Sequence, residues 1–217
     1  SIFLPMSKIV SKEFFSENVV KLEVEAPLIA RSRKAGHFVI VRVDANGERI
    51  PLTIADSDTE KGTITLVIQK IGASSTKITN LNVGDELLDV VGPLGKATHI
   101  DKFGTVVCSG GGVGVAPLLP IIKAMKAAGN KVISVLAART KDLVILEEQV
   151  REYSDEVVIM TDDGSYGKAG RVTDGIEEIA KREKVDLCVT IGPAIMMKFV
   201  SLLTKKYDIP TVASLNT

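Results

Sequence analysis

The sequence changes its pattern close to residue 100, and this change constrains the fold more than any other feature. Residues 1–99 contain short segments rich in β-branched residues, separated by turn signals such as Asn46-Gly47 and Gly84-Asp85. Six of these segments are expected to be strands: 7–15, 19–25, 38–43, 50–55, 63–71 and 86–91. Short, closely spaced strands are typical of a small antiparallel barrel. We therefore predict a six-stranded antiparallel β-barrel over residues 1–99, with one short helix at residues 75–81.

Residues 100–217 instead alternate between apolar strands and helical segments. Strands are expected at 105–109, 131–138, 157–161, 187–191 and 211–214, and helices at 115–128, 146–152, 172–182 and 194–207. Nearly continuous apolar strands that alternate with helices indicate a parallel sheet covered on both faces. The sequence thus predicts two domains, with an α/β parallel-sheet domain over residues 100–217.

Charge and hydropathy narrow the class of protein. Lys and Arg together number 27, as do Asp and Glu, and neither part of the chain has the basic excess typical of nucleic-acid-binding proteins. The chain lacks the run of about 18 apolar residues that a membrane-spanning helix needs, and no signal-peptide pattern is visible. We expect a cytoplasmic protein with neither a nucleic-acid nor a membrane partner.

The two cysteines, Cys108 and Cys188, lie inside apolar runs. They are expected to be buried, reduced thiols. Together with His37 and His99 they do not have the ligand spacing of a zinc site, so no metal site is predicted in this chain.

A glycine-rich segment follows the first strand of the second domain and opens its first helix. It contains Gly110, Gly111, Gly112, Val113 and Gly114, and Pro117 stands in the first turn of the helix. Glycine lets the backbone approach a ligand closely, and a helix N-terminus favours negative charge. A turn that needs glycine only for packing is the alternative, but four glycines in five residues favour a site for a dinucleotide pyrophosphate.

Three more segments end later strands of the same sheet: 138–140, 161–165 and 191–193. Since ligands of open α/β sheets bind beyond the carboxyl ends of the strands, these segments are expected to surround one crevice. The usual G-x-G-x-x-G spacing is not kept, and the second strand ends at Arg139 without a carboxylate. An ordinary dehydrogenase fingerprint is therefore not predicted.

The first domain contains two polar clusters, at residues 49–54 and 69–76. The second has a glycine, three hydroxyl side chains and the expected start of a short helix, a combination suited to phosphate. By itself it is better explained as a Ser/Thr helix cap.

In this order, the motifs resemble the ferredoxin–NADP reductase superfamily. Within it, the chain is similar to two electron-transfer subunits: the flavoprotein subunit of dihydroorotate dehydrogenase and the small subunit of NADH-dependent ferredoxin–NADP oxidoreductase, also called sulfide dehydrogenase. Segments 49–56, 138–143 and 191–197 look most like the second of these.

The resemblance implies that the barrel binds FAD and that the α/β domain binds a nicotinamide nucleotide. Thr53 would be the catalytic residue, with a hydrogen bond near the reactive flavin nitrogen. The expected FAD-binding residues are Arg49, Pro51, Leu52, Thr53, Ile68, Lys70, Gly72, Ser75 and Thr76. The expected nucleotide-binding residues are Gly110, Gly111, Gly112, Val113, Gly114, Pro117, Arg139, Asp163, Gly192 and Pro193.

The chain departs from the family's flavin motif, Arg-x-Tyr-Ser. Aligning Thr53 with its serine places Ile50, not Arg49, at the position of the arginine. One residue of offset turns a side chain to the other face of a strand. Arg49 could bind a flavin phosphate only if a β-bulge restored the parity.

The resemblance favours NAD(H) over NADP(H), although Arg139 and Lys141 could meet a 2′-phosphate. The family's subunits continue into a segment whose four cysteines hold a [2Fe–2S] cluster. This chain ends at Thr217 before any such segment, so we expect a fragment, or else a protein that works without the cluster. The acceptor, the direction of electron flow and the oligomeric state stay open.

The predicted function is electron transfer through FAD between NAD(P)H and a large redox subunit. That subunit would be a glutamate synthase-like flavoprotein or, as an alternative, a dihydroorotate dehydrogenase catalytic subunit. A second alternative is a nucleotide-binding interaction module without catalysis.

Overall fold

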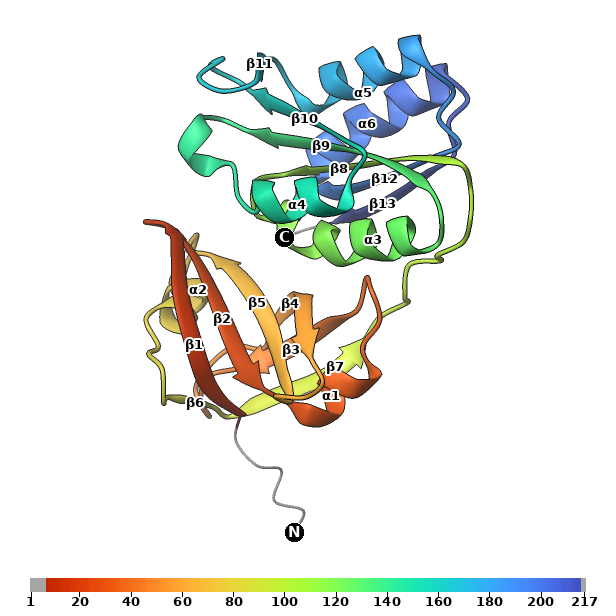
Figure 1. Cartoon of the computed structure of the whole chain (residues 1–217). Helices are drawn as coiled ribbons and strands as arrows, with labels where there is room; N and C mark the ends of the chain where they lie inside the picture. Colours follow the sequence, from red (N-terminus) through yellow and green to blue (C-terminus); the bar gives the residue numbers. More distant parts are fainter. Residues whose placement is uncertain (1–6, 216–217) are drawn as a thin grey trace. The chain divides into compact units, whose positions relative to one another are not determined.

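The computed structural model describes residues 7–215 and contains two compact units. Ser1–Thr98 form the first, here called the barrel unit, and His99–Thr217 form the second, here called the α/β unit. Figure 1 shows the antiparallel strands of the first unit and the layered helices and strands of the second.

The barrel unit is one antiparallel sheet in the order β6-β1-β2-β5-β4-β3-β7. Its strands are β1 (Ser7–Ser16), β2 (Val19–Glu25), β3 (Phe38–Arg42), β4 (Ile50–Asp58), β5 (Thr63–Gln69), β6 (Glu86–Leu87) and β7 (Asp89–Leu94). The two edge strands, β6 and β7, are separated in the chain by Leu88 alone. The sheet must therefore curl until its edges nearly meet, which confirms the predicted antiparallel barrel.

The predicted number of six strands is corrected to seven. The segment expected as one strand, 86–91, divides at Leu88. Its first part pairs with β1 and its second part pairs with β3. One extended segment thus serves both edges of the sheet, and no local sequence signal marks that change of partner.

Alternation along the strands builds the core of the barrel unit. On β2, Val20, Leu22 and Val24 are buried, and the residues between them are more exposed. The two short helices are α1 (Pro27–Ser32) and α2 (Ala73–Thr79). The sequence did not predict α1, and α2 begins two residues before the expected start.

The α/β unit is a parallel sheet, as predicted, and its strands lie in the order β11-β10-β9-β8-β12-β13. The short strand β11 was not predicted. Its strands are β8 (Thr105–Gly111), β9 (Lys131–Ala138), β10 (Glu156–Thr161), β11 (Lys168–Ala169), β12 (Leu187–Gly192) and β13 (Thr211–Leu215). Its helices are α3 (Val115–Ala127), α4 (Glu147–Tyr153), α5 (Val172–Arg182) and α6 (Ala194–Lys206), with 3-10 turns η1 (Gly112–Gly114) and η2 (Lys141–Leu143).

Helices cover both faces of this sheet. In Figure 1, α3 and α4 lie on one face and α5 and α6 on the other. Val107, Ile133 and Cys188 share a core cluster with α5 and α6. Both cysteines are buried and free. Burial raises the pKa of Cys188 to about 12, and burial together with the neighbouring Cys188 raises the pKa of Cys108.

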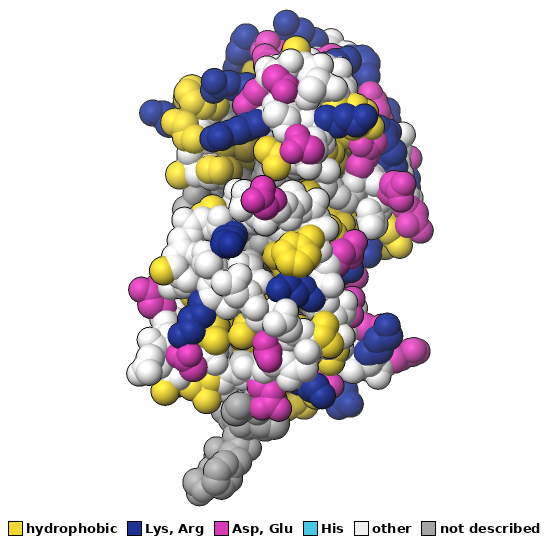
Figure 2. Space-filling view, turned by 90° about the vertical axis from the view of Figure 1, so that its left-hand side faces the viewer, with side chains coloured by type: hydrophobic (Ala, Val, Ile, Leu, Met, Phe, Trp, Pro, Cys, Tyr) yellow, Lys and Arg dark blue, Asp and Glu magenta, His cyan; other side chains and the backbone are white. Residues whose placement is uncertain are grey.

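Charges of both signs are mixed on the face of the molecule that Figure 2 shows. On the face in Figure 2, Lys and Arg side chains lie among Asp and Glu side chains, without a wide area of one sign. Within residues 7–215, no helix is long and apolar enough to span a membrane. The same residues contain no group of three or more His, Cys, Asp or Glu side chains that could hold a metal ion.

Candidate functional site

The carboxyl ends of β8, β9, β10 and β12 meet at one edge of the parallel sheet. β8 and β12 are neighbours, but α3 leaves β8 toward one face whereas α6 leaves β12 toward the other. Such a reversal is the switch point at which open α/β sheets bind ligands. The glycine-rich segment and Gly192-Pro193 both lie at this point.

The glycines of this segment have different structural roles. A Cβ atom on Gly114 would lie 2.7 Å from the carbonyl oxygen of Ile191, so this glycine is needed for close packing on β12. Gly112 has a φ of +55°, and a Cβ built on it would meet nothing within 4 Å. Gly112 therefore borders open space in a backbone conformation that favours glycine. The packing explanation holds for Gly114, and the ligand explanation fits Gly112.

The start of α3 suits an anion. Gly114 is its N-cap residue, Pro117 is buried in its first turn, and no side chain of the described residues caps it. Val113 lies in η1, directly before the helix. The positive end of the helix dipole thus faces a stretch of small residues, the arrangement that binds phosphate groups in many nucleotide sites.

Met196 packs between two further glycines of the site. A Cβ atom on Gly111 would lie 3.0 Å from its sulfur, and one on Gly192 would be just as close to it. Pro193 is the N-cap residue of α6. Gly110, Gly111, Gly192 and Pro193 are therefore brought together at the ends of two neighbouring strands, as the sequence predicted.

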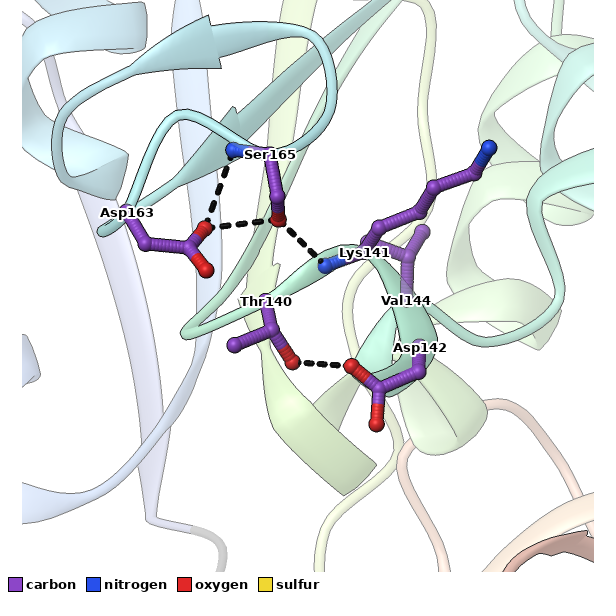
Figure 3. A pocket seen from close by; sticks show the side chains of 6 residues that line it. All are labelled: Thr140, Lys141, Asp142, Val144, Asp163 and Ser165. Carbon is purple, nitrogen blue, oxygen red and sulfur yellow. Dashed lines mark hydrogen bonds between the residues drawn. The ribbon is translucent and has the colours of Figure 1, made fainter.

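A cavity of about 550 Å³ opens beside β9 and β10. It is lined by Thr140, Lys141, Asp142, Val144, Asp163 and Ser165. In Figure 3, Ser165 lies between Asp163 and the backbone of Lys141, and Thr140 turns toward Asp142. The Lys141 N–H donates to Ser165 Oγ over 2.9 Å, and Ser165 Oγ donates to Asp163 over 2.6 Å. These bonds tie together the two loops that form the cavity.

Asp163 is ionised under ordinary conditions. Hydrogen bonds from the hydroxyl and the N–H of Ser165 lower the pKa of its carboxyl. Its own N–H donates to the carbonyl of Arg139 over 3.3 Å. The two predicted nucleotide-binding residues at the ends of β9 and β10 are thus adjacent, and a fixed negative charge stands in the cavity.

Five lining residues were not among the predicted site residues: Thr140, Lys141, Asp142, Val144 and Ser165. Nor was Tyr166, whose hydroxyl donates to Glu147 at the start of α4 over 2.8 Å and whose ring lies 5.1 Å from Lys141 Nζ. Their position directly after two parallel strands was the available signal. The contacts between the two loops form only in the tertiary structure, so the position of these residues in the sequence could not predict them.

In the barrel unit, alternation divides the predicted flavin segment between two faces of β4. Leu52 packs against the barrel core, whereas Pro51 is exposed and Thr53 is half-buried outside the core cluster. Leu52 therefore lies on the face opposite to Pro51 and Thr53. Only the latter two offer side chains to a ligand on the outside of the barrel.

No β-bulge of the kind required for Arg49 as a flavin-phosphate ligand is described between Ile50 and Thr53, and that role of Arg49 stays a prediction. The described pairing of β3 with β4 runs without a register shift from Ile50 to Thr53. The bulge on β4 comes later, at Ala55. The Arg49 guanidinium is exposed and lies 3.4 Å from Asp89.

The second predicted flavin segment surrounds the start of α2. The hydroxyl of Ser75 accepts the N–H groups of Ile71 and Gly72, each over 3.0 Å. Thr76 is half-buried, Lys70 is exposed, and a Cβ on Gly72 would meet nothing within 4 Å. The Ile68 side chain is buried in the core, so any contact of this residue with FAD would use its backbone.

Contacts between α2 and the β3–β4 connection bring the two flavin segments together. Ser74 donates to Glu48 and Lys77 pairs with Asp44, both over 2.7 Å. Lys12 Nζ donates to the carbonyls of Thr79 and Leu81 at the other end of α2, also over 2.7 Å. The open space at Gly72 and the outward faces of Pro51 and Thr53 fit a cofactor on the outside of the barrel.

The described residues do not fit a [2Fe–2S] cluster. Such a cluster takes four ligands, mostly thiolates, and the two cysteines are buried in strands of the sheet. No electron-transfer step is therefore assigned to a cluster within these residues.

Comparison with protein families matches each unit to a known domain. Residues 6–99 match the oxidoreductase FAD-binding domain and residues 109–202 match the oxidoreductase NAD-binding domain. The solved structure of an NADH-dependent reduced ferredoxin–NADP oxidoreductase, studied for flavin-based electron bifurcation, is 39% identical, with a TM-score of 0.93 over 98% of this chain and 77% of that chain. A cytochrome P450 reductase from Amycolatopsis, 21% identical with a TM-score of 0.82 over 97% of this chain and 69% of that one, shares the fold.

Two curated relatives are named as electron transfer subunits or their homologues. The dihydroorotate dehydrogenase B (NAD(+)) electron transfer subunit homolog of Thermotoga maritima is 42% identical over 97% of this chain and 74% of its own length. The electron transfer subunit of Bacillus caldolyticus is 33% identical over 88% of this chain and 75% of its own length.

The fold and its site define a two-domain FAD- and NAD-binding oxidoreductase of the ferredoxin–NADP reductase type. The chain belongs to the family of dihydroorotate dehydrogenase B electron transfer subunits and their homologues.

Proposed function

We propose that this chain carries electrons between NAD(H) and a partner redox protein through FAD. The observation that carries the proposal is the switch point of the α/β unit, where open space at Gly112, the start of α3 and Gly192-Pro193 converge. When bound, FAD supplies the hydride and single-electron chemistry. The protein binds, orients and shields the reactants.

In the α/β unit, the glycine-rich segment would bind the pyrophosphate of the nucleotide. Backbone N–H groups and the α3 dipole would balance its charge. Gly192-Pro193 would hold the end of the nucleotide that reaches the flavin. Arg139 and Asp163 would border the other end, beside the cavity.

The cavity supports NAD(H) rather than NADP(H). The Asp163 carboxylate lines it, and hydrogen bonds from Ser165 keep that carboxylate ionised. A 2′-phosphate placed beside it would meet a like charge, whereas a ribose hydroxyl could donate a hydrogen bond to it. This carboxylate follows the third parallel strand of the chain rather than the second, where the usual fingerprint places it.

In the barrel unit, Pro51 and Thr53 would border the flavin ring. The Thr53 hydroxyl would donate to a flavin nitrogen. Gly72, Ser75 and Thr76 would hold the FAD pyrophosphate, with Lys70 near it. Leu52 and Ile68 would contribute through their backbones, because their side chains belong to the core.

The partner would be a large redox subunit. Relatives named as electron transfer subunits of dihydroorotate dehydrogenase B support its catalytic subunit as one candidate. A glutamate synthase-like flavoprotein is the other candidate, as the resemblance of segments 49–56, 138–143 and 191–197 implies.

Anaerobic titration of the purified chain tests the function. We expect about one non-covalent FAD per chain and bleaching of its absorbance by NADH, at lower concentrations of NADH than of NADPH. The matched control is the variant Gly112→Val, which should retain FAD and lose reduction by NADH. A colourless protein that binds NADH but no added FAD would instead favour the nucleotide-binding module.

A further inference from the structure

Helix α6 is apolar on two opposite faces. Met197, Val200 and Thr204 are buried on the inner face. Ile195, Phe199 and Leu202, here called the outer stripe, are 62%, 47% and 58% exposed. Spacings of four and three residues place these three side chains in one line along the helix. At 100° per residue, that line lies about 180° from the buried one.

A helix that is apolar on both faces is typical of an element covered from both sides. The sheet covers one face of α6, and α5 lies beside it (Figure 1). Single exposed apolar residues are common on protein surfaces. Three large ones in a row form the kind of contiguous surface that marks an interaction site.

Charge around the outer stripe narrows the choice of occupant. α6 carries Lys198, Lys205 and Lys206 and no acidic residue. Lys206 lies 3.6 Å from Glu177 of α5, whereas no ion pair of Lys198 or Lys205 is found among the described residues. A basic rim complements a partner whose apolar centre is surrounded by carboxylates.

A second copy of the chain fits less well. A two-fold axis through the outer stripe would bring the same helix face to itself. Lysines of one copy would then approach lysines of the other, with no acidic residue on either α6 to balance them.

We propose that the outer stripe of α6 is the docking surface for the redox partner of this chain, a protein subunit with an apolar ridge rimmed by Asp and Glu. The identity of the partner rests on the proposed function. The assignment of the outer stripe as a docking surface rests on the exposure and charge of α6.

The test measures binding of the FAD-loaded chain to two probes, a purified dihydroorotate dehydrogenase catalytic subunit and a purified glutamate synthase-like large subunit from the same organism. Leu202→Asp is compared with Leu28→Asp, a matched control on α1 whose leucine is 76% exposed. Neither leucine belongs to a core or to the cofactor sites, so both variants should keep NADH-dependent ferricyanide reduction.

We expect Leu202→Asp to weaken binding at least tenfold and Leu28→Asp to leave it unchanged. The double variant Lys198→Glu/Lys205→Glu should slow association and reduce its dependence on salt. Equal binding by the two leucine variants would overturn the proposal. Failure of the unaltered chain to bind either probe would also overturn it, while reduction by NADH would still uphold the proposed electron uptake.

Two further measurements address other occupants. Concentration-dependent dimers that Leu202→Asp abolishes would assign the outer stripe to a second copy and overturn the proposal. Binding to phosphatidylglycerol vesicles that Leu202→Asp abolishes would assign it to a lipid surface, with the same consequence. The absence of both, together with selective loss of partner binding, supports the docking surface.

Discussion

The two candidate cofactor regions differ in how the chain builds them. In the α/β unit, parallel strands bring every strand-end segment to one edge, so a motif in the sequence is already a place in the fold. In the barrel unit, antiparallel strands alternate between core and surface, so neighbouring residues such as Leu52 and Thr53 face opposite ways. A local motif therefore predicts a site better when topology, rather than side-chain parity, gathers its residues.

The largest effect is expected at Gly112, in the α/β unit. Gly112→Val adds a branched side chain where the pyrophosphate would approach, and we expect the affinity for NADH to fall about 100-fold through loss of ~3 kcal/mol of charge-assisted hydrogen bonds. Bound FAD should remain. The change in affinity is measured by titrating the oxidised flavin with NADH and following its reduction.

Gly129→Val is the matched control for Gly112→Val. Gly129 also has a positive φ, +92°, and a Cβ built on it would make only an ordinary contact with the Lys102 side chain at 3.7 Å, but it follows the far end of α3. It should show the same backbone strain and unchanged NADH affinity. Equal loss of affinity in both variants would show that strain, not the site, is responsible.

Gly114→Ala probes packing in the same segment. The new methyl group would press on the carbonyl of Ile191, and we expect a loss of ~2 kcal/mol in the free energy of unfolding. Thermal or denaturant unfolding measures it. Unchanged stability would contradict the division of roles between Gly112 and Gly114.

Asp163→Ser tests the charge in the cavity. Removing the carboxylate should improve NADPH relative to NADH by about tenfold, or ~1–2 kcal/mol. The ratio of kcat/KM for the two nucleotides is the readout. Asp162→Ser, a neighbouring carboxylate outside the cavity lining, should leave that ratio unchanged.

The pH dependence of this preference has a definite sign. Because hydrogen bonds from Ser165 lower the pKa of Asp163, its charge, and with it the preference for NADH, should persist as the pH falls to the ordinary Asp value of about 4. In Ser165→Ala, the preference should begin to decline at a higher pH. An identical pH profile in the unaltered protein and in Ser165→Ala would show that Ser165 does not control the charge of Asp163.

Thr53→Val carries the smallest expected effect. Loss of one hydrogen bond should change stability by about 1 kcal/mol or less, yet shift the flavin potential by about 30 mV, since ~1.4 kcal/mol corresponds to that shift for two electrons. Spectroelectrochemistry measures the potential. Thr59→Val, in an exposed turn, is the control. An unchanged flavin potential in Thr53→Val would show that Thr53 does not hydrogen-bond to the flavin.

Most strands and helices could be predicted from the sequence because apolar periodicity is local. The glycine-rich segment and the strand-end segments were predicted for the same reason. The burial of Ile68 and Leu52 was not, because it depends on which face of the barrel closes inward. The Lys141–Ser165–Asp163 contacts join loops about 20 residues apart in the chain, and no pattern in either loop specifies them.

The sequence by itself determined the order of strands and helices, the change from antiparallel to parallel organisation, and the presence of a glycine turn at a strand end. These follow from side-chain periodicity and from the backbone freedom of glycine. Only the tertiary structure decided that Gly114 packs while Gly112 borders open space, that 86–91 divides between two partners, and that α6 keeps an apolar face uncovered. Each of those outcomes depends on what lies across from a residue in space, which chain order does not encode.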